Sequence, residues 1–321
     1  MSEKKILVTG AAGFIGFHLS MSLLEDGYEV LGIDSINDYY DTSLKVARIN
    51  QLKPYAKFKF DKIDIANRES ISQSFKSFKP HKVVNLAAQA GVRYSIQNPQ
   101  AYLEANLIGF FNIIELCRHN DVKGLIYASS SSVYGANKKM PFSENDKVDK
   151  PLALYGATKK ANELIAHSYS HLYGLHSTGL RYFTVYGPWG RPDMAMFIFT
   201  KKIMAGEPIP VYNNGNMKRD FTYIDDIVVG TRKAIDKNYK CEVFNLGNNK
   251  SEQLKKMIYL IEKALDKKAK INLLPIQPGD VTESFANITK SKKMLNFKPT
   301  TNIDDGIQRF INWYKDYFNI N

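Results

Sequence analysis

The fold of this 321-residue chain is decided near its start, by the stretch Lys5-Ile6-Leu7-Val8-Thr9-Gly10-Ala11-Ala12-Gly13-Phe14-Ile15-Gly16. Residues 5–9 contain the strand-like run Ile6-Leu7-Val8 and are bounded by a glycine, which is the pattern of a short buried strand. Residues 14–25 continue with apolar residues at helical spacing, and a second strand predicted over residues 28–33 ends at Asp34. The order strand, glycine turn, helix, strand and acidic residue indicates a dinucleotide-binding unit.

Each glycine of this stretch has a separate task. Gly10 permits the tight turn, Gly13 lets the backbone approach a pyrophosphate, and Gly16 allows the helix to pack closely on the strand, while the helix N-terminus faces the phosphates. The spacing is G-x-x-G-x-x-G rather than G-x-G-x-x-G, so the interpretation depends on the surrounding strands and on Asp34, 18 residues after Gly16. An acidic residue here binds both ribose hydroxyls and repels a 2′-phosphate, which favours NAD over NADP.

The strand–helix alternation continues over the first half of the chain. Strands are predicted at residues 57–60, 83–88, 125–128 and 176–182, and helices at residues 42–51, 71–78, 99–119 and 155–173. Alternation over ~180 residues predicts an α/β fold with a doubly wound, Rossmann-like parallel sheet. Ligands bind at the carboxyl ends of such strands. The residues expected at these ends are Gly10, Asp34, Ala87, Ser130 and Tyr182.

After residue 183 the pattern becomes irregular. Helices are predicted at residues 194–206, 225–237, 251–266 and 304–318, and short strands at 209–212 and 219–223. We expect an NAD-binding domain over residues 1–183 and a smaller, interleaved substrate domain over residues 184–321. Some segments of the second, at about 219–246, are expected to return to the first.

Composition narrows the class of protein. No apolar run reaches the ~18 residues of a membrane helix, no signal-peptide pattern precedes the first strand, and the two cysteines and six histidines show no metal-ligand or disulfide spacing. The net charge of +12 suits an anionic ligand, but the lysines are scattered and form no dense tract with interleaved aromatic residues. We expect a soluble cytoplasmic protein without a metal, a membrane or a nucleic-acid partner.

A second motif lies further along the chain. The run Ser129-Ser130-Ser131-Ser132 ends the fifth predicted strand, and Tyr155 and Lys159 share one face of the following helix. An unperturbed tyrosine titrates near ~10. A neighbouring ammonium favours the phenolate, so Lys159 is expected to lower the pKa of Tyr155 and make it a base toward a substrate hydroxyl, with a serine sharing the proton. Most Tyr-x-x-x-Lys pairs in proteins only share a helix face and have no catalytic role. Here the glycine motif precedes the pair in the order expected of a dinucleotide-dependent enzyme, which favours a catalytic role.

Together these motifs resemble the extended short-chain dehydrogenase/reductase superfamily, and within it the nucleotide-sugar 4-epimerases, most closely the bacterial UDP-glucuronate 4-epimerases. The resemblance covers nearly the whole chain and includes residues 87–95, 183–194, 218–223 and 277–281. It implies an isomerase that oxidises carbon 4 of a UDP-hexuronate to a transient 4-keto intermediate with NAD. The implied catalytic residues are Tyr155, Lys159 and Ser130. The expected cofactor-binding residues are Gly10, Gly13, Phe14, Ile15, Gly16, Asp34, Asp64, Ile65, Ala87, Tyr155 and Lys159. Asp64 serves equally well as a turn residue.

The resemblance also implies a substrate site. Arg219 resembles the arginine that holds the UDP diphosphate, and Tyr212 resembles the aromatic residue that packs on uracil. Asp280 resembles a group near the uridine ribose. For Arg93 two interpretations are open: contact with the diphosphate or sugar, or a structural ion pair. Where sugar dehydratases and UDP-xylose-forming decarboxylases carry acidic residues, this chain has only Ser130, Ser131 and Ser132. The hydroxyls of Ser131, Ser132 and Thr184 and the guanidinium of Arg191 are expected to hold a substrate carboxylate. Gln277 stands where galactose epimerases have an arginine, and Thr184 stands where they have an asparagine. Both differences argue against UDP-galactose as the substrate.

Two alternatives stay open. One is a 4-epimerase of another UDP-sugar, such as UDP-N-acetylglucosamine or UDP-glucose. The other is a non-catalytic dinucleotide-binding protein that senses redox state or binds RNA. The resemblance further implies a homodimer, in which the helices at 99–119 and 155–173 pair with those of a second subunit as a four-helix bundle.

Overall fold

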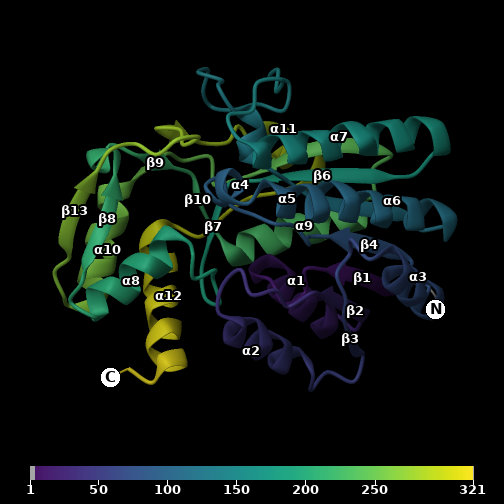
Figure 1. The fold of residues 1–321 in the computed structure, drawn as a ribbon, viewed down its shortest axis with the longest axis horizontal. Helices are drawn as coiled ribbons and strands as arrows, with labels where there is room; N and C mark the ends of the chain where they lie inside the picture. Colours follow the sequence, from purple (N-terminus) through teal and green to yellow (C-terminus); the bar gives the residue numbers. More distant parts are fainter. Residues whose placement is uncertain (1–3, 321) are drawn as a thin grey trace.

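The computed structural model describes residues 4–320 and is built on a seven-stranded parallel sheet in the order β11-β6-β5-β4-β1-β2-β3 (Figure 1). Its strands are β1 (Lys5–Thr9), β2 (Glu29–Asp34), β3 (Phe58–Lys62), β4 (Lys82–Asn85), β5 (Gly124–Ser130), β6 (Ser177–Tyr182) and β11 (Cys241–Leu246). The predicted doubly wound sheet is confirmed. Strand β1 pairs with β2 on one side and with β4 on the other, so the order in which the chain adds strands to the sheet changes direction at β1, beside the glycine turn. Ligands bind at this switch point in such sheets.

Helices cover both faces of this sheet. Helices α1 (Phe14–Glu25), α2 (Thr42–Leu52) and α9 (Ile224–Lys237) lie on one face, and α3 (Arg68–Phe78), α6 (Phe110–His119) and α7 (Leu154–Tyr173) on the other. Alternate residues of β1 therefore enter different cores: Ile6 belongs to the cluster that contains α1, and Leu7 to the cluster that contains α3 and α6. Burial on both faces explains why the three central residues of this strand, Ile6, Leu7 and Val8, are all apolar.

The helix predicted over residues 99–119 is divided in the structure. It consists of α5 (Pro99–Tyr102), a π-helical segment η1 (Leu103–Gly109) and α6, and is preceded by the short α4 (Tyr94–Gln97). The buried Asn106 lies in the π segment and holds the chain after β4, accepting from the Gln89 N–H at 2.9 Å and donating to the Gln89 carbonyl at 3.0 Å. Single-turn π segments of this kind are common beside functional sites.

The second half of the chain forms a smaller lobe, at the left of Figure 1. Its elements are β7 (Thr184–Tyr186), α8 (Ala195–Met204), β8 (Pro208–Tyr212), η3 (Asn213–Gly215), β9 (Lys218–Arg219), β10 (Phe221–Tyr223), β12 (Glu252–Gln253), α10 (Leu254–Leu265), β13 (Lys270–Leu274), β14 (Glu283–Ser284) and α12 (Ile303–Phe318). Helix α11 (Thr289–Leu295) follows β14 in the chain but packs against α9 and β11 beside the large sheet. The sequence analysis did not predict β7, β13 and β14, and it placed β12 inside the helix expected at 251–266, because strands of two to five residues show too few alternations to recognise. It also missed α11, whose seven residues span only about two turns. Between these elements α9 packs on α1, and β11 pairs with β6. The division at residue 183 stays a prediction.

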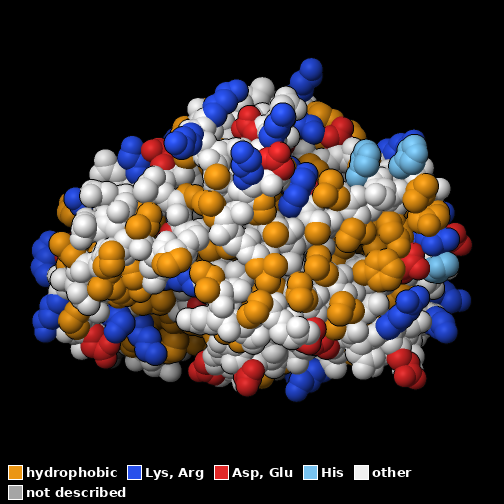
Figure 2. Space-filling model, turned by 45° about the horizontal axis from the view of Figure 1, so that its top comes forward, with side chains coloured by type: hydrophobic (Ala, Val, Ile, Leu, Met, Phe, Trp, Pro, Cys, Tyr) orange, Lys and Arg blue, Asp and Glu red, His pale blue; other side chains and the backbone are white. Residues whose placement is uncertain are grey.

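One surface of the molecule carries apolar side chains that are exposed to solvent. They gather over α6 and α7 and the π segment, as Figure 2 shows for that face. The residues are Leu103, Ile108, Phe111, Leu164, Leu172 and Tyr173, each at least 38% exposed. Among residues 4–320, none of the helices combines the length and the hydropathy needed to cross a bilayer.

Candidate active site

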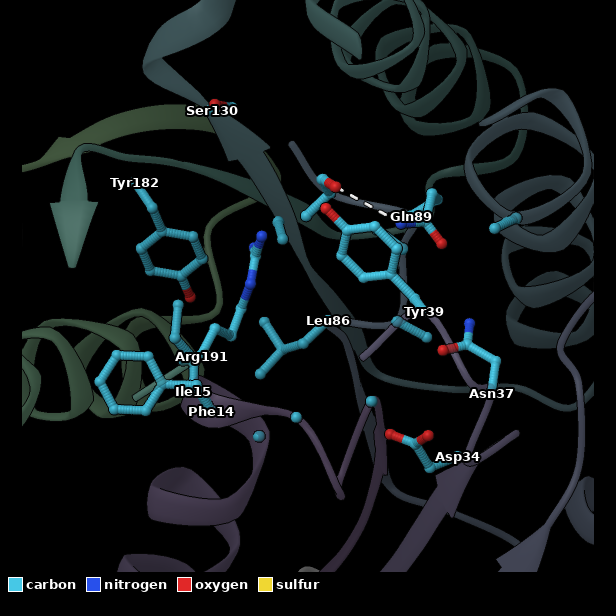
Figure 3. Close-up of a pocket in the computed structure, with 18 of the residues that line it drawn as sticks. Phe14, Ile15, Asp34, Asn37, Tyr39, Leu86, Gln89, Ser130, Tyr182 and Arg191 are labelled. Carbon is cyan, nitrogen blue, oxygen red and sulfur yellow. Dashed lines mark hydrogen bonds between the residues drawn. The ribbon is translucent and has the colours of Figure 1, made fainter. Parts of the chain in front are cut away.

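A cavity of about 280 Å³ opens at the carboxyl ends of the central strands. Ser130 and Tyr182 lie on one side of it and Asp34 and Asn37 on the other (Figure 3). All of the expected catalytic and cofactor-binding residues line this cavity. They are Gly10, Gly13, Phe14, Ile15, Gly16, Asp34, Asp64, Ile65, Ala87, Ser130, Tyr155 and Lys159.

The glycine turn leaves no room for side chains. A Cβ atom at Gly10 would lie 2.8 Å from the Ala87 nitrogen, and one at Gly16 would lie 2.1 Å from the Gly10 carbonyl oxygen. Gly10 also has φ +73°, which an L side chain disfavours. Gly13 caps helix α1 without a side chain over the first turn, so the free N–H groups there are open to an anion. These features fit the diphosphate of a dinucleotide.

Asp34 ends β2 beside this turn. Its carboxylate accepts hydrogen bonds from the backbone N–H groups of Ala12 at 3.1 Å and Ile36 at 2.9 Å. Burial raises the pKa of Asp34, while the Ile36 hydrogen bond and the charge of Lys45 oppose the shift. The carboxylate is therefore oriented by the backbone and keeps lone pairs for a ribose. Asp64 lines the cavity and also accepts from the Ala66 N–H at 2.8 Å, as a turn residue does.

Helix α7 carries both members of the Tyr-x-x-x-Lys motif into the cavity. The buried Lys159 ammonium donates to the Ala128 carbonyl at 3.0 Å, and burial lowers its pKa to about 8. Burial raises the pKa of the Tyr155 phenol, while hydrogen bonding with Ser130 and the charge of Arg191 oppose this. The pKa of Tyr155 is thus raised rather than lowered in this structure, because desolvation of the phenolate outweighs the Ser130 hydrogen bond and the charge of Arg191. The effect expected of Lys159 on this phenol stays a prediction.

Arg191 is the one expected substrate residue that lines the same cavity. Its guanidinium is already held by Asp193: Nε donates to Oδ1 at 3.0 Å and Nη2 to Oδ2. The Tyr39 hydroxyl donates to the same carboxylate at 3.1 Å. Asp193 therefore occupies the Nε–Nη2 edge of Arg191, and the Nη1–Nη2 edge keeps its N–H donors for another carboxylate.

Four other expected substrate residues form a separate cluster. Asp280 pairs with Arg219 at 3.1 Å and with Arg93 at 3.6 Å, and the Arg93 guanidinium lies 4.5 Å from the ring centroid of Tyr212. Arg93 follows β4, whereas the other three belong to the smaller lobe. None of the four lines the cavity. The cluster thus connects the two lobes beside the Tyr155 site.

The remaining expected residues lie at the edge of the site. Ser131 and Ser132 begin the 3-10 turn η2 (Ser131–Tyr134). The Ser130 hydroxyl donates to the Ser132 hydroxyl at 3.2 Å. Thr184 lies on β7, where its N–H donates to the Asp220 carbonyl at 3.1 Å. None of Ser131, Ser132 and Thr184 lines the cavity.

Several lining residues were not foreseen. They include Asn37, Tyr39, Lys45, Gln89, Ala105 and Met194. Lys45 donates to the Asn37 carbonyl at 2.6 Å, next to Asp34. The signal was weak: residues 35–56 had only the composition of a loop followed by a short helix, and Ala105 reaches the cavity through the π segment. Within residues 4–320, no cluster of three or more His, Cys, Asp or Glu residues is arranged to hold a metal ion.

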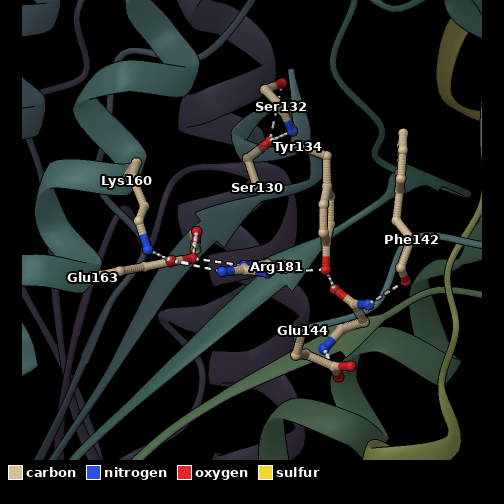
Figure 4. Close-up of polar contacts among 10 residues, drawn as sticks. Ser130, Ser132, Tyr134, Phe142, Glu144, Lys160, Glu163 and Arg181 are labelled. Carbon is tan, nitrogen blue, oxygen red and sulfur yellow. Dashed lines mark hydrogen bonds and ion pairs between the residues drawn. The ribbon is translucent and has the colours of Figure 1, made fainter. Parts of the chain in front are cut away.

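A buried network of charged and polar side chains contacts the serine run at the end of β5 (Figure 4). Glu163, on α7, accepts from the Ser129 hydroxyl at 2.7 Å and pairs with Arg181 of β6 through two bonds of 2.8 Å. Arg181 also donates to the Tyr134 hydroxyl at 3.0 Å. Burial raises the pKa of Glu163, but the bonds and charge of Arg181 outweigh this and hold it below the usual range. The network joins α7, β5 and β6 directly under the site.

Comparison with known proteins agrees with this geometry. Residues 6–247 match the model of the "NAD dependent epimerase/dehydratase family". UDP-glucuronate 4-epimerase 4 of Arabidopsis thaliana is 47% identical over 98% of this chain and 76% of that protein.

Solved structures match equally well. UDP-glucuronic acid 4-epimerase from Bacillus cereus, in complex with UDP-glucuronic acid and NAD, superposes with a TM-score of 0.92 at 36% identity, covering 98% of this chain and 99% of that one. UDP-glucose 4-epimerase from Thermotoga maritima, with UDP-glucose, superposes with a TM-score of 0.90 at 30% identity, covering 98% and 99%.

The depressed pKa of Lys159 predicts a pH-dependent stability. The ammonium titrates near 10.5 in the unfolded chain and near 8 in the folded chain, so the folded protein binds fewer protons in this window and its stability rises with pH there. We expect Lys159→Met in cofactor-free protein to increase the free energy of unfolding at pH 7 by roughly 1–3 kcal/mol. The gain should shrink as the pH rises through 8 toward 10. Urea unfolding at pH 7, 8, 9 and 10 measures this, with Lys237→Met as an exposed control; a gain independent of pH would contradict it.

The Glu163 network predicts a large loss of stability. Glu163→Gln leaves the Arg181 guanidinium buried without its counter-charge, and we expect the free energy of unfolding to fall by about 3–5 kcal/mol. Ser129→Ala removes only one hydrogen bond to the carboxylate and should reduce it by about 1–2 kcal/mol. Urea unfolding at pH 7 compares the two variants. Equal, small effects would show that Arg181 finds other partners.

Proposed function

The chain belongs to the NAD-dependent epimerase/dehydratase family, and we propose that this NAD-dependent isomerase inverts carbon 4 of a UDP-hexuronic acid, interconverting UDP-glucuronate and UDP-galacturonate. One observation carries the proposal: Tyr155, Lys159, Ser130 and Arg191 converge in one cavity at the dinucleotide-binding turn. The first three are the groups needed to oxidise a hydroxyl reversibly, and the fourth is a cation suited to a carboxylate.

The residues divide the work as follows. NAD, when bound, supplies the acceptor and later the donor of the hydride. Tyr155 removes the proton from the 4-hydroxyl, with Ser130 sharing that proton, and returns it after the 4-keto sugar has turned over. Burial raises the pKa of the phenol, so the positive charges of Lys159 and Arg191 are needed to stabilise the phenolate during the reaction. Arg219 holds the diphosphate while the sugar rotates.

The carboxylate determines which sugar fits. The 4-keto intermediate is a β-keto acid that loses carbon dioxide readily, so its carboxylate has to be held. Arg191, Ser131, Ser132 and Thr184 are proposed for this task, and the absence of acidic residues at positions 130–132 removes the repulsion that a carboxylate would meet there. UDP-glucose or UDP-N-acetylglucosamine is the alternative substrate, since a UDP-glucose 4-epimerase shares the fold. A non-catalytic role fits less well, because Tyr155 and Lys159 both face the cavity.

The proposed setting is cytoplasmic nucleotide-sugar metabolism that supplies polysaccharide biosynthesis. Both cysteines, Cys117 and Cys241, are free thiols, which agrees with a reducing compartment. We also propose a homodimer in which the apolar faces of the π segment, α6 and α7 pair with those of a second copy as a four-helix bundle. The exposed Phe111 and Leu164 support this interface, since contiguous exposed apolar patches mark association sites.

Proton NMR of the purified protein with UDP-glucuronate tests the reaction directly. We expect signals of the carbon-4 epimer to grow to an equilibrium mixture, and Tyr155→Phe to lower kcat by about 10²–10⁴-fold through loss of the base. Tyr169→Phe, on the same helix but bonded to Glu115 at 2.7 Å, should leave the rate unchanged. Release of carbon dioxide with formation of mostly UDP-pentose, or turnover of UDP-glucose alone, would contradict the proposal.

Light scattering after size exclusion tests the dimer. Phe111→Lys combined with Leu164→Lys places charges in the proposed bundle, so we expect the mass to fall from dimer to monomer. Ile271→Lys, which changes an equally exposed apolar residue on β13, should leave the mass unchanged. A double variant that stays dimeric would rule out this face as the interface.

A further inference from the structure

Arg48 is a fully buried arginine that makes no ion pair within residues 4–320. It is 0% exposed, and its guanidinium donates only to neutral oxygens. These are the carbonyls of Ala12 at 2.8 Å, Trp189 at 2.6 and 3.1 Å and Gly190 at 3.2 Å, and the Tyr40 hydroxyl at 2.9 Å. The Asp34 carboxylate lies close enough for the charge of Arg48 to lower its pKa, but among the described residues no hydrogen bond or ion pair joins the two side chains. A buried charge that is only partly compensated is unfavourable.

The two loops that Arg48 joins serve different ligands. Ala12 belongs to the glycine turn between Gly10 and Gly16, which forms the cofactor side of the cavity. The Gly190 carbonyl belongs to the peptide unit that leads into Arg191, which lines the substrate side. One side chain from α2 thus holds backbone atoms of both loops, 36 and 142 residues away in the sequence.

The loop that carries Arg191 needs such a support. Trp189 has φ +62° and Gly187 φ +144°, and a left-handed conformation at a bulky residue such as tryptophan is unfavourable. Two N–H groups of Arg48 converge on the Trp189 carbonyl, and His18, whose pKa burial lowers to about 4, contacts the Pro188 carbonyl at 2.9 Å. Arg48 is therefore placed to set the direction in which the chain enters Arg191.

The charge of Arg48 also has a natural compensator. Arg48 binds the glycine turn through the Ala12 carbonyl, and the free N–H groups at the start of α1 in the same turn suit anionic phosphates. Lys45, one turn earlier on α2, lines the same cavity and is also buried. Binding a diphosphate there would balance the buried charge and make the arrangement of both loops more favourable.

We propose that Arg48 is a positioning residue that fastens the phosphate-binding turn of the cofactor to the loop that presents Arg191, so that filling the cofactor site tightens the binding of a carboxylate-bearing substrate. This inference rests on the proposed function, because it assigns the carboxylate to Arg191. A purely structural Arg48 would affect stability alone. A positioning Arg48 changes the preference for UDP-glucuronate over UDP, which lacks the carboxylate.

Isothermal titration calorimetry with UDP and with UDP-glucuronate separates these cases. Each ligand is titrated into wild type, Arg48→Lys, Arg191→Met and the double variant, with and without NAD. Arg48→Lys keeps the charge but cannot reach three carbonyls at once. We expect it to weaken UDP-glucuronate by about tenfold relative to UDP, and to reduce the factor by which NAD tightens UDP-glucuronate binding. In the Arg191→Met background the same change should have no further effect on the preference, because the two residues act through one contact.

Arg232→Lys is the matched control. Arg232 also joins distant segments, through Ser22 at 2.9 Å and Asp26 at 2.6 Å, but it does not line the cavity. It should lower the melting temperature without altering the ligand preference.

The proposal is overturned if Arg48→Lys weakens UDP and UDP-glucuronate equally, or if its effect persists undiminished in the Arg191→Met background. Failure of the proposed function looks different: wild type would then show no preference for UDP-glucuronate over UDP, and Arg191→Met would change nothing.

Discussion

The hydrogen bond from the buried Lys159 ammonium to the Ala128 carbonyl joins helix α7 to the end of strand β5. An ammonium in the interior is strongly unfavourable without such a partner, so the contact restricts how the helix lies on the strand and thereby where Tyr155 stands relative to Ser130. One turn further along α7, the ion pair of Glu163 with Arg181 holds the helix to the neighbouring strand β6. The position of the reacting groups therefore depends on buried charge placed on one helix.

Electrostatics explains why the site needs its ligands. Burial raises the pKa values of Tyr155 and Asp34 and lowers those of Lys159 and Lys45, so the surroundings of the cavity disfavour the charged forms of these four groups. Anionic phosphates and a carboxylate would place negative charges beside the lysines and arginines. The phenolate of Tyr155 would be stabilised most by those cations that no ligand neutralises. A chain of net charge +12 that collects cations around one cavity is suited to a substrate and a cofactor that both carry diphosphates.

Loops rather than regular elements connect the two lobes. Asp280 binds Arg219 of its own lobe and Arg93 from the loop after β4, while Arg48 binds backbone of the glycine turn and of the loop after β7. The sheet supplies a rigid edge, and these arginines connect the loops to it. This arrangement separates cofactor binding, which the scaffold provides, from substrate selection, which side chains on the loops provide.

The sequence by itself determined the parallel sheet, the glycine turn with Asp34 at the next strand end, and the shared face of Tyr155 and Lys159, because each depends on spacing within one or two elements. It could not show that Asp193 holds Arg191, that the helix at 103–109 widens into a π segment, that β13 forms, or that burial raises the pKa of Tyr155. Only the tertiary structure decided these features. Hydrogen bonds such as that between Arg48 and Trp189 connect residues 141 positions apart, and desolvation depends on everything packed around a group, which no local pattern contains.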